Sequence, residues 1–213
     1  MSSTINRRPL KTRSNNLAVT FAKWISSKNI TPNQISILSI VAAAIASYSL
    51  LQTQNNEFRS FWLIISVVFI QGRLLCNLLD GMVAVEGGKG TPAGELFNDI
   101  PDRIADSIIL IALGYTVNFP MMGWCAALIA VMTAYVRVLA ISTGAPTSFT
   151  GPMAKPHRMA LVSFACLLSC FESSFTEVGN TLYISLLILI IGSIITVYRR
   201  TIMAYKFLEG KVK

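Results

Sequence analysis

Residues 77–102 decide the fold of this chain, and they read NLLDGMVAVEGGKGTPAGELFNDIPD. Apolar residues continue on both sides, so the stretch joins two long apolar segments through the short connection 86–93. At about 100° per residue, the polar residues of each segment fall on one helical face. The faces contain Arg73, Asn77, Asp80 and Ala84 on the first helix and Gly94, Asn98, Asp102 and Asp106 on the second. Because ionisable groups are costly inside a membrane, the stretch predicts two antiparallel helices whose polar faces meet within a bundle.

The composition extends this prediction to the whole chain. Its 213 residues are 53% hydrophobic and 13% charged, which excludes a disordered chain and disfavours an ordinary soluble domain. A membrane-spanning helix needs ~20 mostly apolar residues. Six segments meet this requirement, at 33–52, 60–85, 94–117, 120–142, 157–173 and 179–199. We therefore expect an all-α integral membrane protein, a single domain over residues 1–213 with six transmembrane helices.

An amphipathic helix is expected before the first span. Its apolar stripe consists of Leu17, Phe21, Trp24 and Ile25, with Lys23 and Lys28 beside it. This pattern is typical of a helix that lies flat among lipid headgroups, so residues 1–30 are expected to form a cytoplasmic or interfacial segment. The next helix opens with Thr31-Pro32-Asn33-Gln34, in which Thr31 can N-cap and Gln34 can complete a capping box.

Basic residues are distributed unevenly among the connections. Those on one side are Arg7, Arg8, Lys11, Arg13, Lys23, Lys28, Lys89, Lys155, Arg158, Arg199, Arg200, Lys206, Lys211 and Lys213. The opposite connections carry Glu57, Glu172 and Glu177 against the single cation Arg59. The positive-inside rule then predicts that both termini are cytoplasmic, and we expect a location in the bacterial inner membrane. The net charge of +8 is thereby assigned to membrane orientation and lipid headgroups, with no nucleic-acid partner.

The polar faces suit a particular chemistry. Carboxylate and amide oxygens gathered near one membrane surface are the ligands that a hard divalent cation prefers. The small residues Gly81, Ala84 and Gly94 let a bulky ligand approach the backbone. These features suit a diphosphate, whose oxygens a cation bridges while an aspartate deprotonates an attacking hydroxyl.

The same residues resemble the motif of the CDP-alcohol phosphatidyltransferases. The family motif is D-x-x-D-G-x-x-A-R, eight residues, then G-x-x-x-D-x-x-x-D, and the chain keeps that register from Asn77 to Asp102. The matching residues are Asp80, Gly81, Ala84, Gly94 and Asp102. The resemblance continues in segments 30–36 and 134–137, and it covers most of the chain. It implies an enzyme of phospholipid biosynthesis that transfers a phosphatidyl, or related, group from a CDP-linked donor to an alcohol and releases CMP.

The resemblance also implies roles for individual residues. The ligands of Mg²⁺ or Mn²⁺ would be Asn77, Asp80, Asn98 and Asp102. Asp102 would also be the catalytic base. The residues beside the donor, CDP-diacylglycerol or a similar molecule, would be Gly81, Ala84 and Gly94. Apart from the resemblance, three cations exceed what a neutral alcohol requires, and they would bind the acceptor if it carries a phosphate: Arg137, Lys155 and Arg158. A homodimer is plausible from the same resemblance.

The chain departs from the motif at three positions. Asn77 and Asn98 replace the first and third aspartates, which removes two formal negative charges and favours the loss of one of the family's two ions. Val85 replaces the arginine. Candidates to supply the missing carboxylates are Asp99, Asp106, Glu86 and Glu95. Candidates to supply the missing cation are Lys89, Arg103 and Arg73.

Other interpretations of the polar faces remain open. Buried charges are usually paired, so Asp80 and Asp102 could belong to a helix-packing network with arginines. The arginines available for such a network are Arg73, Arg103 and Arg137. The two asparagines favour a non-catalytic descendant that binds a CDP-lipid or anionic lipid, whereas the retained Asp102 argues against it. Ion transport is disfavoured, because the acids cluster near one membrane face without a relay towards the other.

Overall fold

The computed structural model describes residues 20, 24, 27–28, 30–54, 57–89, 91, 93–172 and 179–210. Six long helices form the architecture of this part of the chain. They are α2 (Pro32–Gln52), α3 (Arg59–Glu86), α4 (Gly94–Thr116), α5 (Pro120–Ser142), α6 (Lys155–Ser169) and α7 (Asn180–Leu208). Each begins within two residues of its predicted position, so the all-α organisation is confirmed. Helix α6 ends earlier than predicted and α7 ends later.

Local sequence explains where several helices begin. Thr31 caps α2, because its Oγ1 accepts a hydrogen bond from Gln34 N at 3.3 Å and Gln34 Oε1 accepts one from Thr31 N at 3.0 Å. This is the predicted capping box. Prolines occupy the first turn of α2, α5 and α6, where the missing N–H removes no helical hydrogen bond.

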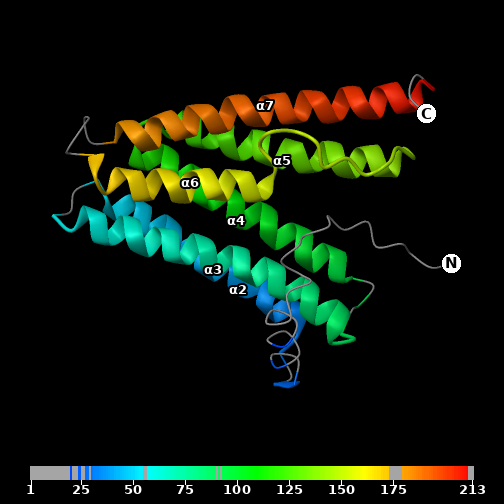
Figure 1. Ribbon diagram of the computed structural model, residues 1–213, viewed down its shortest axis with the longest axis horizontal. Helices are drawn as coiled ribbons and strands as arrows, with labels where there is room; N and C mark the ends of the chain where they lie inside the picture. The colour runs from blue at the N-terminus through cyan, green and yellow to red at the C-terminus, as the bar shows by residue number, and fades with distance from the viewer. Residues whose placement is uncertain are drawn as a thin grey trace.

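The six helices lie lengthwise beside one another in one bundle (Figure 1), and their contacts follow a ring. Helix α2 packs against α3 and α4, and α7 packs against α5 and α6. Contacts of α3 with α6 and of α4 with α5 complete the order α2, α3, α6, α7, α5, α4. Helices α4 and α5 approach very closely, since a Cβ on Gly114 would lie 2.5 Å from Gly123 Cα. Buried apolar side chains from all six helices fill one continuous core.

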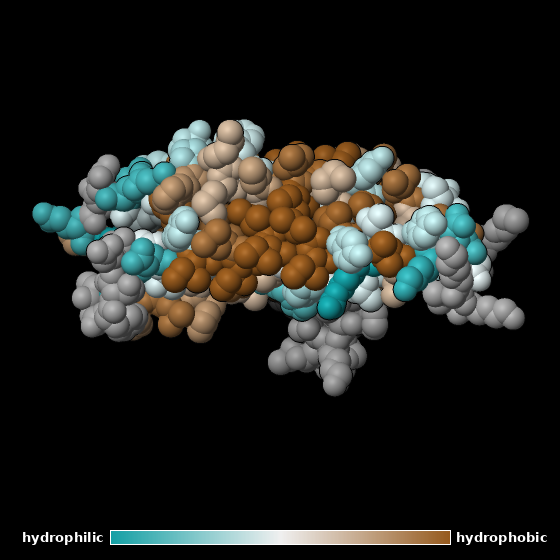
Figure 2. Space-filling view, turned by 90° about the horizontal axis from the view of Figure 1, so that it is seen from above, coloured by the Kyte–Doolittle hydropathy of each residue, from teal (hydrophilic) through white to brown (hydrophobic). Residues whose placement is uncertain are grey.

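On the face shown in Figure 2, an apolar surface covers the middle of the bundle, with hydrophilic residues towards its two ends. Four helices are long and apolar enough to cross a membrane, at Pro32–Gln52, Arg59–Val85, Pro120–Ser142 and Asn180–Leu208. This confirms an integral membrane protein. Helix α4 does not meet the same requirement, because its polar face carries several charged residues. Helix α6 has 15 residues and extends only about 22 Å, less than the ~30 Å thickness of bilayer hydrocarbon.

The predicted amphipathic helix before α2 falls mainly outside the described residues. Of its stripe, Leu17, Phe21 and Ile25 lie outside them, and so does Lys23. Lys28 Nζ lies 5.9 Å from the centre of the exposed Trp24 ring, a cation–π distance. The interfacial position of residues 1–30 therefore stays a prediction.

Candidate active site

The polar faces of α3 and α4 contribute to one buried cluster. Asp80 on α3 is 2% exposed and Asp102 on α4 is 4% exposed. The two carboxylates are close enough to interact electrostatically, and Lys155 at the start of α6 lies within the same range. The spacing of the motif thus brings its two retained aspartates together where α3 ends and α4 begins.

Asp80 is held by a residue of a third helix. Ser36, near the start of α2 and itself buried, donates a hydrogen bond from Oγ to Asp80 Oδ2 at 2.6 Å. Asp80 Oδ1 is buried and has no hydrogen-bond partner among the residues that the structure describes. Ser36 was not predicted as a site residue, although it belongs to the segment 30–36 that resembles the family. Its place in that segment, close to the capped start of α2, was the feature of the sequence that could have indicated it.

Asp102 is bound by two cations. Lys155 Nζ forms a salt bridge with Asp102 Oδ2, and Arg73 Nη2 lies 3.4 Å from Asp102 Oδ1. Arg73 Nη2 also donates to the Asp102 backbone oxygen at 3.3 Å. The packing network considered from the sequence therefore exists for Asp102, and Arg73 is its arginine. Both oxygens of the candidate base face positive charge.

Asp106, one turn further along α4, lies in the buried interior behind Asp102. Arg73 Nη2 lies 2.6 Å from Asp106 Oδ1, and Arg158 Nη2 donates to Asp106 Oδ2 at 2.9 Å. Arg158 is 1% exposed, and its Nη1 also donates to Thr133 Oγ1 at 3.2 Å and to the Met153 backbone oxygen at 3.0 Å. This arrangement connects α3, α4, α5 and α6 around one carboxylate.

The two asparagines of the motif lie half-buried on the same faces. The Nδ2 atom of Asn77 is buried without a hydrogen-bond partner, one turn before Asp80. Oxygen and nitrogen of an amide are assigned from hydrogen bonding alone, so this side chain can equally present its oxygen there. Asp80 Oδ1 and the amide oxygen of Asn77 are donors of the type that a hard divalent cation prefers. Among the described residues, no group of three or more His, Cys, Asp and Glu side chains forms a metal centre, so the donors fit a weak site.

The predicted donor positions lie on the same part of α3 and α4. Gly81 is buried, whereas Ala84 and Gly94 are half-buried. A Cβ added to Gly94 would meet only Thr91 Oγ1, at an ordinary contact distance of 3.6 Å. Space therefore exists beside the backbone of Gly94, as a ligand approaching this end of α4 requires.

Arg137, from the end of α5, pairs with Asp99 of α4. Its Nη2 donates to Asp99 Oδ2 at 3.0 Å, and Arg103 Nη2 donates to Asp99 Oδ1 at 3.3 Å. Asp99 has 42% of its side chain exposed, so this group of charges is partly open. The carboxylate or phosphate partner that a guanidinium within an apolar helix requires is here a carboxylate.

These contacts also bear on the residues proposed to replace the missing motif groups. Of the three cations considered to replace the missing arginine, Arg73 contacts the motif aspartate Asp102. Arg103 pairs with Asp99, and Lys89 Nζ donates to the Ile30 backbone oxygen at 3.4 Å. Asp99 and Asp106 are both engaged by arginines. The side chains of Glu86 and Glu95 lie outside the described part of the structure.

The connection 143–154 fixes the position at which α6 begins. Arg200 of α7 donates from Nε to the Thr150 backbone oxygen at 3.0 Å and from Nη1 to the Thr133 backbone oxygen at 2.7 Å. The backbone N–H of Met153 donates to Thr196 Oγ1 at 3.0 Å. From the sequence, Arg200 was assigned only to membrane orientation. Its buried hydrogen bonds instead hold the segment that leads to Lys155.

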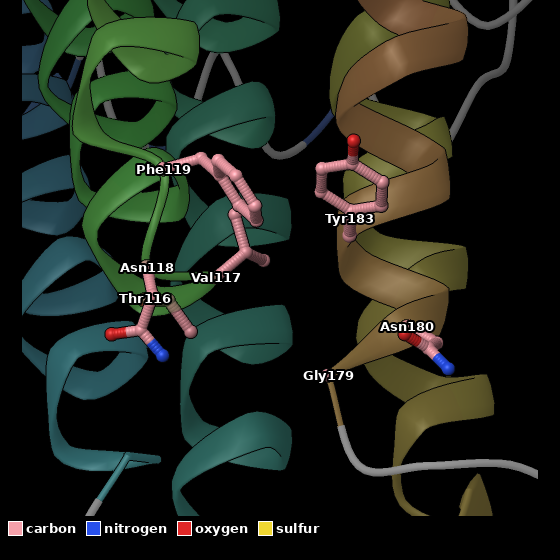
Figure 3. Close-up of a pocket in the computed structure, with 7 residues that line it drawn as sticks. All are labelled: Thr116, Val117, Asn118, Phe119, Gly179, Asn180 and Tyr183. Carbon is pink, nitrogen blue, oxygen red and sulfur yellow. The ribbon is translucent and has the colours of Figure 1, made fainter.

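A pocket of about 350 Å³ lies at the opposite end of the bundle (Figure 3). It is formed by the α4–α5 connection and the start of α7, where the rings of Phe119 and Tyr183 lie with centres 5.0 Å apart. None of its lining residues is charged or belongs to the motif. It therefore contributes nothing to the cluster around Asp80 and Asp102.

Comparison with known proteins gives consistent relatives. The archaetidylinositol phosphate synthase of Pyrococcus horikoshii is 28% identical over 189 residues, which is 88% of this chain and 90% of the relative. The phosphatidylinositol phosphate synthase of Mycolicibacterium smegmatis is 25% identical over 84% of this chain and 79% of the relative.

The fold is shared with a solved enzyme structure. The Mycobacterium tuberculosis phosphatidylinositol phosphate synthase in complex with manganese and citrate superposes with a TM-score of 0.74, at 20% identity over 88% of both chains. The same enzyme with CDP-DAG bound gives a TM-score of 0.73, at 20% identity over 90% of this chain and 94% of that one. The sequence model of the CDP-alcohol phosphatidyltransferases matches residues 29–202, most of the chain. The chain therefore belongs to the CDP-alcohol phosphatidyltransferase family and is an enzyme of that class.

Proposed function

We propose that this enzyme transfers a phosphatidyl group from CDP-diacylglycerol to a small phosphorylated alcohol and releases CMP. The observation that carries the proposal is the buried pair Asp80 and Asp102, which α3 and α4 place together in the register of the family motif. The unpartnered Asp80 Oδ1 supports a ligand-binding role for this pair. The relatives support the choice of substrates, because two are named as synthases of inositol phosphate lipids and one was solved with CDP-DAG.

The reaction exchanges one phosphorus–oxygen bond for another. The hydroxyl oxygen of the acceptor attacks the phosphorus that carries the lipid, and the bond from that phosphorus to CMP breaks. The hydroxyl proton passes to Asp102, and CMP leaves as a phosphate monoester. Arg73 and Lys155 hold the Asp102 carboxylate in one orientation, and Ser36 does the same for Asp80.

The chain's own residues also provide for a divalent cation, Mg²⁺ or Mn²⁺. Asp80 and Asn77 would hold it, with Asn98 and Asp102 as the remaining motif positions. When bound, such a cation stabilises negative charge on the diphosphate oxygens as CMP departs. Gly81, Ala84 and Gly94 would leave room for the nucleotide of the donor.

The assay that tests this function measures CMP and lipid product together. Purified protein in detergent is given CDP-diacylglycerol, Mg²⁺ or Mn²⁺, and a panel of free and phosphorylated alcohols. We expect metal-dependent CMP release with a phosphorylated polyol and no release in excess chelator. CDP-diacylglycerol binding without CMP release under any condition would instead identify a catalytically inactive lipid-binding descendant.

The acceptor site is expected to use Arg137 more than Arg158. Arg137 pairs with the half-exposed Asp99, which an incoming phosphate can replace, whereas Arg158 is enclosed by protein partners. We expect Arg137→Ala to raise the acceptor KM roughly 10- to 100-fold, as loss of a charge-assisted hydrogen bond requires, with kcat little changed. Arg103→Ala is the matched control, because Arg103 also pairs with Asp99. Equal KM values in both variants and the wild type would make Arg137 a structural charge.

We also propose that both termini are cytoplasmic and that α4 and α6 cross the membrane within the bundle. If successive helices alternate in direction, the connections that carry basic residues and the end of α7 lie at the same end of the bundle. This supports the proposed orientation. In a variant without its native cysteines, Lys89→Cys should react with an impermeant maleimide only from the cytoplasmic side. Glu57→Cys should react only from the other side. Labelling of position 89 from outside would reverse the orientation.

A further inference from the structure

We propose that the Lys155 ammonium occupies, on Asp102, the place of a second divalent cation, so that this enzyme binds one such ion. The inference rests on the proposed function, because it concerns how the same site balances its charge. The family resemblance implies two ions for a motif with four aspartates, and this chain retains two of those aspartates. The cation lost with the asparagines is supplied by the chain itself.

The contacts of the two retained aspartates differ in the way this inference requires. Both oxygens of Asp102 face protein cations, Lys155 at Oδ2 and Arg73 at Oδ1, and its side chain is 5% exposed. Asp80 has one oxygen bound by Ser36 and the other buried without a partner. One carboxylate is therefore already neutralised, and the other still lacks a cation.

The charges of the cluster support the same conclusion. Among the side chains that the structure describes, its carboxylates are Asp80, Asp102 and Asp106, and its cations are Arg73, Lys155 and Arg158. Three negative and three positive groups balance before any ion binds. Aspartates at 77 and 98 would leave an excess of negative charge for a further cation to neutralise. With asparagines there, one divalent ion already makes the cluster positive, which suits an anionic diphosphate donor and disfavours a second ion.

Hydrogen bonds to the backbone around Lys155 hold this residue beside Asp102. Pro156 follows it in the first turn of α6, and the preceding Met153 is bonded through its backbone to Thr196 and Arg158. Arg200 bonds the Thr150 carbonyl in the same connection. Because the backbone on both sides is held, the ammonium has a short and defined reach to Asp102. Asn98, one turn before Asp102 on α4, offers no competing carboxylate.

The experiment counts Mn²⁺ ions bound per chain. Metal-free protein in detergent is dialysed to equilibrium against Mn²⁺, and free Mn²⁺ is measured by electron paramagnetic resonance. We expect one ion per chain in the wild type and still one in Asn98→Asp, because Lys155 keeps Asp102. We expect two ions in Asn98→Asp combined with Lys155→Met.

Control variants separate the ammonium from a general effect of charge. Asn98→Asp with Lys155→Arg retains a cation on Asp102 and should bind one ion, as should Asn98→Asp with Lys89→Met. Lys155→Gln replaces Lys155→Met if the latter does not yield folded protein, since an amide can still donate to Asp102. The proposal would be overturned by two ions in the wild type or in Asn98→Asp alone, and equally by no ion in the wild type. It would also be overturned by one ion in Asn98→Asp combined with Lys155→Met and in Asn98→Asp combined with Lys155→Gln.

The outcome is independent of the CMP-release assay. Turnover with two bound ions would leave the transferase function intact and refute the role of Lys155. One bound ion without CMP release would support the role of Lys155 and refute the transferase function.

Discussion

Replacing Asp102 by asparagine is expected to reduce CMP release at least about 100-fold. A general base contributes roughly 10²- to 10⁴-fold, and an amide cannot accept the hydroxyl proton. The substitution also leaves Lys155 and Arg73 without the charge that now binds them. Initial rates at saturating donor, acceptor and Mg²⁺ measure the effect, because kcat rather than KM should change.

Asp99→Asn is the matched comparison for this variant. Asp99 lies one turn earlier on the same helix and also binds arginines, but it is half-exposed and outside the proposed proton transfer. Its asparagine variant should keep most of its turnover, and the acceptor KM should fall because Arg137 is released. Wild-type kcat in Asp102→Asn would require a different base.

Arg158→Met is expected to cause the largest loss of stability. The guanidinium is 1% exposed and binds Asp106 at 2.9 Å, and its removal leaves a buried carboxylate with one partner fewer. Breaking a buried pair in this way costs about 3–5 kcal/mol. In a protein of this size, such a loss lowers Tm on the order of 10 °C, which thermal unfolding in detergent can measure.

A second substitution tests the reason for this effect. Arg158→Met combined with Asp106→Asn should recover part of the lost Tm, because the unpaired negative charge has also been removed. Wild-type Tm in Arg158→Met, together with a raised acceptor KM, would show that Arg158 binds the acceptor phosphate instead.

The helices of this fold were predictable because their signals are local. The Thr31 and Gln34 capping box and the prolines at helix starts mark boundaries within a few residues of chain. Hydropathy found α6, but its end was placed at 173 instead of Ser169. The ring order was not predictable, because it depends on which apolar faces fit together, as in the Gly114 and Gly123 contact.

Only the part of the candidate site that follows from residue spacing along a helix was predictable. Asp80 and Asp102 were predicted from their spacing along two helices that are consecutive in the sequence. Their partners were not, because Ser36 is 44 residues from Asp80 and Lys155 is 53 residues from Asp102. From the sequence, Lys155 is predicted to bind an acceptor phosphate, and in the structure its ammonium forms a salt bridge with Asp102. A sequence does not show which oppositely charged group lies nearest once the helices have packed.

The late start of α6 has a consequence for where the lipid product accumulates. Helix α6 begins partway along the bundle (Figure 1), and Lys155, its first residue, forms a salt bridge with Asp102 of α4. With the function and orientation proposed above, the chemistry would take place near the headgroups of a single leaflet. A donor can react there with its acyl chains still in that leaflet, while a water-soluble alcohol arrives from the aqueous phase. The new lipid stays in the leaflet that supplied the donor, and its appearance in the opposite leaflet requires a separate lipid translocator.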